Sequence, residues 1–470
     1  MKSFLYIIIS LFLFLFAPYD YSFIFCAVCA TVYALHSVRV IKNTHKHIAT
    51  GIIEFNILFL VSAFAVIYVF PLFIYGVFSE YSFQQLSLFR DSSVNKVTAL
   101  CTFAYSIYLS SFEHSYFRAR QKSYIKTVQI QVTNHALHIA KILSIISVVV
   151  FTINILFFVR TIDAQHNELT VNPYIAELTK CILIVYAICC CERYKEEIRN
   201  NRKAFFHNCF FPIICFTVII LEYFYIGDRG FIIVGVLTLV FLYNYYVRKI
   251  KTVIVVPIAV VAIIGISLIG QLRKTDSSIR EGGLSAFSVA SSELVTSQSS
   301  WLEYISDLTL VSNVAYLEWD YNTGTKFYNP SRILVIISMP VPLAPTLISN
   351  ILYGNSTKSA STASVVTQFY QNMTTSMGGD GGLGTQAVMD LYMSWNILGV
   401  ILGMWLLGLF IGKASAVKDY NVYFLLILIT HFGLAIYLPR STVYMCFRTV
   451  VWEIVLLNLI TKVEKKIIQR

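Results

Sequence analysis

Residues 252–270 read TVIVVPIAVVAIIGISLIG, and residues 271–283, which follow, read QLRKTDSSIREGG. The first stretch is an unbroken apolar run of the length that a helix needs to cross about 30 Å of hydrocarbon. The second stretch opens a mainly polar segment that continues to about residue 386, and every other segment between apolar runs is much shorter. We therefore expect a membrane protein with one large loop between two groups of spanning helices.

The composition agrees with a helical membrane protein. Of the 470 residues, 57% are hydrophobic and 13% are charged, and the mean hydropathy is +0.68. Soluble domains average about 25% charged residues, and a membrane β-barrel would show short alternating strands in place of long apolar runs. We predict an all-α polytopic membrane protein. Its transmembrane helices, about twelve in number, are expected near residues 3–17, 20–37, 51–75, 97–113, 139–159, 174–191, 205–226, 230–247, 252–270, 387–412, 420–438 and 442–460.

These helices and the large loop divide the chain into three parts. Residues 1–270 are expected to hold the first nine transmembrane helices, residues 271–386 the large loop, and residues 387–470 the last three helices.

The distribution of positive charge sets the expected orientation. Most of the 36 lysines and arginines fall in short loops and tails of one side. The short loops of the other side hold only Arg90, Lys96, Arg160, Arg229 and Arg440. Because cytoplasmic loops are the ones enriched in Lys and Arg, we expect both termini in the cytoplasm and the large loop outside it. The net charge of +11 then follows from topology and needs no nucleic-acid partner.

Three features of the large loop predict local structure. Residues 301–319, WLEYISDLTLVSNVAYLEW, carry apolar side chains at helical spacing, which predicts an amphipathic helix. Residues 332–351 are apolar but are interrupted by three prolines, which predicts an interfacial or re-entrant element packed on the bundle. The cluster GGDGGLG at residues 378–384 predicts a hinge, with a backbone site for phosphate as the alternative.

The ten cysteines all fall in apolar segments or at their ends, and none lies in the large loop. That loop therefore has no disulfides. The pair Cys26 and Cys29 has no second pair to complete a metal site, so we expect structural thiols and no metal.

Ionisable residues at the outer ends of the spans are the main functional candidates, because charge near hydrocarbon is costly. Arg229 and Arg440 lie in tight outer turns, and Arg448 lies about two turns into the last span. Arg440 and Arg448 are separated by roughly 80° of helical rotation, so both can lean toward one outer cavity. Interfacial anchoring is the alternative for Arg229 and Arg440, and a structural bridge to another span is the alternative for Arg448.

Other charged residues in the spans have structural interpretations that need no ligand. Glu177 and Lys180 are three residues apart and are expected to pair with each other. Glu453 lies on a different side of its helix from Arg448 and is not expected to pair with it. Asp390 lies at the start of the tenth span, where the helix dipole also favours a carboxylate.

Several arginines around one outer cavity suit a phosphate ligand. Guanidinium groups bind phosphate oxygens through paired hydrogen bonds and stay charged when they are desolvated. At the outer leaflet, a multiply charged and membrane-anchored candidate is a lipid-linked pyrophosphate.

The run GTQAVMDLYMSWNILGVILGMWLLGLFIG at residues 384–412, the Arg229 turn and the large outer loop resemble the Wzy-type O-antigen polymerases, which polymerise oligosaccharide repeat units of bacterial surface polysaccharides. The resemblance covers the whole chain in span count and loop placement. That family often has Glu where this chain has Asp390. The local motifs are Asp228-Arg229-Gly230, the spaced set Asp390, Tyr392, Asn396 and Gly399, and Arg440.

The resemblance implies a GT-C-like membrane glycosyltransferase of the bacterial inner membrane that uses no metal or other cofactor. Such an enzyme moves a growing glycan from undecaprenyl pyrophosphate onto a hydroxyl of the next lipid-linked repeat unit, at the periplasmic face. The implied partners are the undecaprenyl-pyrophosphate-linked oligosaccharide, the membrane lipid and a chain-length regulator protein.

Pyrophosphate is already a good leaving group, so the protein mainly has to neutralise its charge and orient the hydroxyl. We expect Asp390 or Glu318 to act as the catalytic base. The residues expected to bind the pyrophosphate are Arg229, Arg332, Arg440 and Arg448, followed by Arg273 and Arg280.

Two other activities remain as alternatives. An O-antigen ligase relies on a histidine in its large outer loop, and this chain has no histidine between His207 and His431. A lipid-linked oligosaccharide flippase, which is a transporter, should have short outer loops and charges along a central path.

Overall fold

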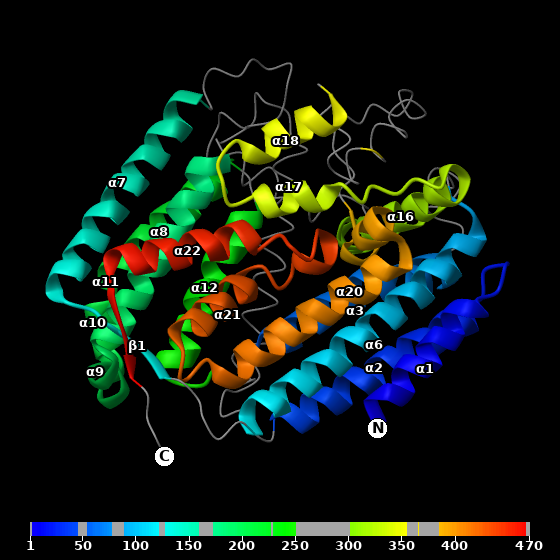
Figure 1. Cartoon of the computed structure of the whole chain (residues 1–470), viewed down its shortest axis with the longest axis horizontal. Helices are drawn as coiled ribbons and strands as arrows, with labels where there is room; N and C mark the ends of the chain where they lie inside the picture. The colour runs from blue at the N-terminus through cyan, green and yellow to red at the C-terminus, as the bar shows by residue number, and fades with distance from the viewer. Residues whose placement is uncertain are drawn as a thin grey trace.

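The computed structural model describes residues 2–45, 54–77, 89–121, 127–158, 173–226, 229–250, 301–354, 365 and 385–466. In these residues the chain is a helical bundle with one small two-stranded sheet (Figure 1). The helices before the large loop are α1 (Lys2–Leu15), α2 (Phe23–His45), α3 (Phe55–Phe64) with the π-helix η1 (Ala65–Ile74) and α4 (Tyr75–Val77), α6 (Asp91–Gln121), α7 (Asn134–Phe158), α8 (Pro173–Arg193), α9 (Lys195–Asn200), α10 (Arg202–Asn208), α11 (Phe210–Ile226) and α12 (Arg229–Tyr246). The later helices are α16 (Trp301–Thr325), α17 (Arg332–Ser338), α18 (Ala344–Tyr353), α20 (Ala387–Val417), α21 (Val422–Gly433), the 3-10 helix η3 (Leu438–Arg440) and α22 (Phe447–Ile460).

Each expected span that the structure describes contains helix, but the last two, 420–438 and 442–460, hold only the shorter helices α21 and α22. Among the residues that the structure describes, five helices are long and apolar enough to cross a membrane, or six if the bent pair formed by α10 and α11 is one span. Several other expected spans are helices that are shorter or less apolar, and the expected span at 252–270 lies outside the described residues. The chain is therefore a multi-pass membrane protein, and the number twelve stays a prediction.

The bundle has two distinct ends in Figure 1. One end carries α16, α17 and α18, and we name it the loop end. The other carries both chain termini and the sheet, and we name it the tail end. The sheet pairs β1 (Thr127–Gln131) antiparallel with β2 (Lys462–Lys466), so the last strand of the chain joins the segment that follows α6.

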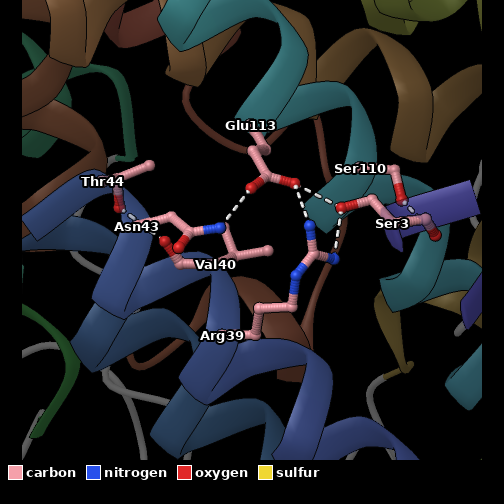
Figure 2. Close-up of polar contacts among 7 residues, drawn as sticks. All are labelled: Ser3, Arg39, Val40, Asn43, Thr44, Ser110 and Glu113. Atoms are coloured by element: carbon pink, nitrogen blue, oxygen red, sulfur yellow. Dashed lines mark hydrogen bonds and ion pairs between the residues drawn. The ribbon is translucent and has the colours of Figure 1, made fainter. Parts of the chain in front are cut away.

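A polar cluster at the tail end joins α1, α2 and α6 (Figure 2). The Glu113 carboxylate accepts a hydrogen bond of 2.8 Å from the Asn43 amide and lies 3.5 Å from the Arg39 guanidinium. It also accepts from the Ser3 hydroxyl, to which Arg39 donates at 2.9 Å. Each charge in this cluster has a partner, so the cluster fixes three helices without leaving an unpaired ion.

Helix α20 is broken inside the apolar run. Asn396 has φ 57° and Trp395 has φ −140°, and both depart from helical geometry. Asparagine tolerates a positive φ better than most residues, and the Asn396 side-chain oxygen accepts a hydrogen bond of 2.6 Å from the Ile397 amide. The break lets residues 387–394 fold back on the rest of the helix, so that Leu391 packs against Gly399 and Gly403. The straight part, residues 397–417, is still long enough to cross about 30 Å.

Glycines also set the contact between α20 and α6. A Cβ atom at Gly412 would lie 2.5 Å from the Phe112 carbonyl oxygen, and one at Gly408 would lie 2.4 Å from the Tyr108 carbonyl oxygen. The two backbones therefore touch, as small residues spaced by four allow in membrane helices.

The expected amphipathic helix at 301–319 is present as α16, but its environment differs from the prediction. Eight consecutive residues from Val311 to Glu318 are buried, so this stretch is enclosed on all sides and not on one face. Ser312 donates a hydrogen bond to the Val66 carbonyl oxygen in the π-helix η1, where the altered helical register frees backbone acceptors. Helix α16 is thus built into the bundle.

The proline-interrupted segment forms the helical hairpin α17–α18. The turn between the two helices spans residues 339–343, and neither helix is long enough to cross a membrane. Apolar side chains on this hairpin remain exposed, among them Ile337, Val341 and Leu347. An interfacial position agrees with this pattern.

Gly412→Ala should loosen the contact between α6 and α20. The added methyl group meets backbone atoms that cannot rotate away, and overpacking of this kind costs about 1–3 kcal/mol. Thermal unfolding of the detergent-solubilised protein should show a lower midpoint. Gly324→Ala is the matched control, because no atom lies within 4 Å of the added carbon. A Gly412→Ala midpoint equal to that of the control would contradict the close packing.

Candidate functional site

Four side chains at the loop end form a buried polar cluster, which we call the Arg332–Asp390 cluster. Its members are Arg332 from α17, Asp390 and Ser394 from α20, and Tyr444 from the turn before α22. Arg332 forms an ion pair with Asp390 Oδ1 and donates to Ser394 Oγ at 3.1 Å. Tyr444 donates to Asp390 Oδ2 at 2.7 Å, and its ring lies 5.2 Å from the Arg332 guanidinium.

The local sequence explains how the cluster forms. Asp390 lies in the first turn of α20, where the helix dipole favours a carboxylate. Ser394 follows one turn later on the same face. Arg332 opens α17, and the backbone N–H of Asn329, three residues earlier, donates a hydrogen bond of 3.1 Å to the Met393 carbonyl oxygen. The broken start of α20 therefore holds both partners of the ion pair in place.

Burial makes this ion pair a strong positional constraint. Asp390 is fully buried and Arg332 is 4% exposed. Burial alone would lower the pKa of Arg332, but the adjacent Asp390 carboxylate raises it above its ordinary value. Both oxygens of Asp390 are engaged, one by the guanidinium and one by the Tyr444 hydroxyl.

Glu318 lies beside this cluster. Its side chain is fully buried. It belongs to α16, which is not among the helices that are candidate membrane spans. The Thr385 hydroxyl donates to Oε1 at 2.7 Å, whereas Oε2 has no hydrogen-bond partner among the described residues. Burial raises the pKa of Glu318 to about 8, the negative charge of Asp390 adds to this, and the Thr385 bond and Arg332 oppose it. Glu318 is therefore a mostly neutral acid near pH 7 whose proton can exchange close to that pH.

The predicted arginines fall into separate places. Arg332 pairs with one predicted carboxylate, Asp390, and its charge also acts on the other, Glu318. Arg448 instead lies over the rings of Tyr174 and Trp452, at 5.3 Å and 6.0 Å from their centroids.

The other predicted arginines are described less fully. Arg440 ends η3 and is half-buried. Arg229 opens α12, but its side chain lies outside the described residues, as do Arg273 and Arg280 altogether.

The expected pair of Glu177 and Lys180 is confirmed, at 2.8 Å. Thr449 donates to the second oxygen of Glu177, and Thr430 donates to Glu453. Within the described residues Glu453 forms no ion pair with Arg448, as the helical spacing predicted.

Some residues of the cluster were not predicted from sequence. Ser394 could have been found from its spacing of four residues after Asp390. Tyr444 could not, because it reaches the cluster from a remote segment, and Thr385, which bonds to the neighbouring Glu318, lies in a segment without a pattern of its own.

Metal centres and cavities are the other kinds of site to compare with this cluster in the part of the chain that the structure describes. Within the described residues, no group of three or more His, Cys, Asp or Glu side chains is placed to hold a metal ion. A polar cavity of about 320 Å³ is lined by residues such as Glu192, Lys418 and Asp419. It lies at the tail end, far from the Arg332–Asp390 cluster.

Comparison with known proteins adds the family context. The family model described as O-antigen polysaccharide polymerase Wzy matches residues 1–467. No curated protein and no solved structure matches the chain.

Breaking the buried ion pair should be costly. Asp390→Asn or Arg332→Met each leaves one buried charge unpaired, which costs about 3–5 kcal/mol. The double variant should lose less than the sum, with a coupling of about 0.5–3 kcal/mol. Thermal unfolding of the wild type, the two single variants and the double variant measures this coupling. Arg199→Met with Glu196→Gln, an exposed pair at the tail end, is the control and should show little coupling. Additive losses at Arg332 and Asp390 would contradict the pair.

Glu318→Gln should change how stability depends on pH. Because folding raises the pKa of Glu318 from 4.5 to about 8, its ionisation opposes folding. The stability contribution is complete below pH 4.5 and is lost as the pH rises through about 8. The variant lacks this loss, so its free energy of unfolding should exceed that of the wild type by an amount that grows between pH 5 and 9. The difference should reach a few kcal/mol, at about 1.4 kcal/mol per pKa unit. It is measured as a higher unfolding midpoint of the variant. Glu196→Gln is the control for the carboxyl-to-amide change, and parallel curves for wild type and Glu318→Gln would refute the prediction.

Proposed function

The chain belongs to the O-antigen polysaccharide polymerase Wzy family, and on that premise we propose that it joins undecaprenyl-pyrophosphate-linked repeat units into surface polysaccharide at the periplasmic face of the bacterial inner membrane. The observation that carries the proposal is the family match over residues 1–467, which covers both helical parts and the large loop. The multi-pass helical bundle agrees with an enzyme that acts on a lipid-linked oligosaccharide.

The orientation is part of the proposal. The loop end would face the periplasm and the tail end the cytoplasm, because the short loops of the tail end carry most of the positive charge. Both termini would then be cytoplasmic. The three-part division at residues 270 and 386 and a GT-C-like architecture also belong to this proposal.

The reaction needs charge neutralisation and one proton transfer. The acceptor hydroxyl oxygen attacks the anomeric carbon of the donor sugar, and the bond from that carbon to the pyrophosphate oxygen breaks. The leaving pyrophosphate keeps the electron pair, and the hydroxyl proton passes to a base. A nearby guanidinium that neutralises the leaving group lowers the barrier without a metal ion.

Among the candidate bases, the geometry favours Glu318 over Asp390. Both oxygens of Asp390 are engaged, whereas one oxygen of Glu318 has no partner among the described residues. A base is most effective when its pKa is close to the working pH, which the raised pKa of Glu318 approaches. Asp390 would then be a positioning residue, which holds Arg332 and Tyr444 in place.

The arginines have different proposed roles. Arg332 is compensated by Asp390, so we assign it to holding the start of α20. Arg229, Arg440 and Arg448, with Arg273 and Arg280, remain the proposed pyrophosphate-binding residues. A chain-length regulator is a proposed protein partner.

A complementation experiment tests the function. In a strain that lacks the gene, Glu318→Gln and Arg440→Ala should leave surface lipopolysaccharide with a single repeat unit, because a positioned base contributes about 100-fold or more to the rate. Gels of surface glycan and membrane blots measure the result. Arg199→Ala, exposed at the tail end, is the control and should restore long chains.

The same gels separate the alternatives. A flippase lesion would give no repeat units, and a ligase lesion would leave polymer on the carrier lipid. Normal ladders from both variants would refute the site assignment.

A further inference from the structure

Four glutamates of the helical bundle are each bonded to a threonine hydroxyl. The pairs are Glu177 with Thr449, Glu222 with Thr152, Glu318 with Thr385 and Glu453 with Thr430. A hydroxyl can donate to a carboxylate or accept from a carboxylic acid, so such a pair suits either form of the glutamate. The form that is favoured depends on where the single hydroxyl hydrogen goes.

At two of the four pairs the threonine hydroxyl has a second acceptor. Thr152 Oγ1 lies 3.0 Å from the Val148 carbonyl oxygen, and Thr430 Oγ1 lies 3.0 Å from the Leu426 carbonyl oxygen, each four residues earlier in the same helix. A hydroxyl has one hydrogen, and a carbonyl oxygen can only accept. When the hydrogen goes to the carbonyl, the glutamate has to supply the hydrogen of its own bond. These two pairs therefore suit a neutral acid.

Glu318 has a different environment from the other three glutamates. Glu177 has the Lys180 ammonium 2.8 Å away, whereas Glu318 has no cation in ion-pair contact among the described residues. Thr385 lies before α20 begins, so no carbonyl one helical turn earlier competes for its hydrogen. Its hydroxyl donates to Glu318 Oε1 at 2.7 Å. A donor on one oxygen favours the carboxylate, which is the form that a base needs.

Thr385 is held in place by the residue that follows it. Both Thr385 and Gln386 are buried. The Gln386 carbonyl oxygen accepts a hydrogen bond of 2.8 Å from the Asp390 amide, and its side-chain oxygen accepts one of 3.3 Å from the Cys101 thiol. The first bond starts α20 and the second reaches α6. The Thr385 hydroxyl is therefore presented to Glu318 from a segment that two helices fix.

The groups around Glu318 change its proton affinity in both directions. Burial raises its pKa to about 8, and the Thr385 hydroxyl is the strongest of the groups that lower it, ahead of the Arg332 charge. The charge of Asp390 raises the pKa. The Cys101 thiol of α6 is bonded to the N-cap residue of α20, and η1, which contacts α16, contains no charged residue. Without the Thr385 donor, the carboxylate would therefore form only at a higher pH.

We propose that Thr385 is a positioning residue of the polymerase reaction, whose hydroxyl holds Glu318 Oε1 so that Oε2 is left to take the proton of the acceptor sugar. This inference rests on the proposed function and deepens it. In the step itself, the acceptor O–H bond breaks, its hydrogen passes to Oε2, and the oxygen forms the bond to the anomeric carbon. The pyrophosphate departs with the electron pair. Thr385 acts through Glu318 and takes no part in the bond changes.

The dependence of the polymerisation rate on pH tests the proposal. Lipid-linked repeat units are extracted from the deletion strain and polymerised by the full chain in lipid nanodiscs. The rate of the wild type should rise with pH up to about 8, as Glu318 becomes charged. Thr385→Val keeps the shape of the side chain but removes the donor, so this rise should move to higher pH by about one unit. The rate at about pH 7 should fall about tenfold and should recover at higher pH.

Two further variants separate the hydroxyl from the packing. Thr385→Ser keeps the hydroxyl and should restore the wild-type profile. Thr430→Val removes the corresponding hydroxyl from Glu453 and is the matched control, whose profile should keep the wild-type midpoint. An unshifted profile for Thr385→Val, or a loss by the same factor at every pH in both Thr385→Val and Thr385→Ser, would overturn the positioning role.

Stability gives a second measurement that needs no turnover. The difference in free energy of unfolding between Thr385→Val and the wild type should be constant while Glu318 is neutral in both folded proteins. The variant should lose further stability as the pH rises above about 8, because its carboxylate lacks the donor. In a Glu318→Gln background the same substitution should give a difference that does not change with pH. A difference that is independent of pH in both backgrounds would contradict the link between Thr385 and the charge of Glu318.

These results can be separated from the proposed function. If deletion of the gene gives single-repeat glycan but Thr385→Val keeps the wild-type pH profile, the positioning role is wrong and the polymerase proposal stands. If deletion leaves long chains intact while the stability of Thr385→Val depends on pH as expected, the hydrogen bond stands. The polymerase proposal then falls, and the role of Thr385 in the reaction falls with it.

Discussion

The close contact between α20 and α6 is the constraint on which the rest of the loop end depends. Gly408 and Gly412 let the two helix backbones touch, and this fixes the long part of α20. Gly399 and Gly403 then accept Leu391 from the broken start of the same helix. A side chain at Gly399 or Gly403 would collide with Leu391, so these two glycines leave room for the folded-back segment that carries Asp390. The position of the ion pair is therefore set by backbone packing some distance away from it.

The buried ion pair contributes specificity more than stability. Two charges removed from water regain their desolvation cost only when the pairing is nearly complete. The bonds to Ser394 and Tyr444 complete it, and they bring α17, α20 and the start of α22 to one point. Glu318 lies in the field of this pair, and its proton affinity depends on burial and on both charges. A fixed pair next to a titratable acid gives the loop end a defined electrostatic environment.

The sequence allowed the helical membrane fold to be predicted, together with the helix at 301–319 and a proline-interrupted element at 332–351 that does not span the membrane, because these depend on local composition and spacing. It also indicated Arg332, Asp390 and Glu318 as candidates. It did not show that Arg332 and Asp390 are partners, since residues far apart in the chain meet only through the fold-back of α20. The burial of residues 311–318 of α16 on all sides was also missed, because apolar spacing indicates a helical face and says nothing about a second covering layer. Asn396 gave no local signal of the helix break beyond its tolerance of a positive φ.

The sheet between β1 and β2 has a consequence for biogenesis. β1 leaves the ribosome well before β2, because most of the described helices lie between the two strands in the sequence, so β1 waits on the order of tens of seconds for its neighbour. Pairing can occur only after α22 has been inserted, because β2 follows it directly. The sheet thus closes only once α22 is in place, and a chain truncated before Lys462 is left with an open strand edge on β1 that is available to quality-control proteases.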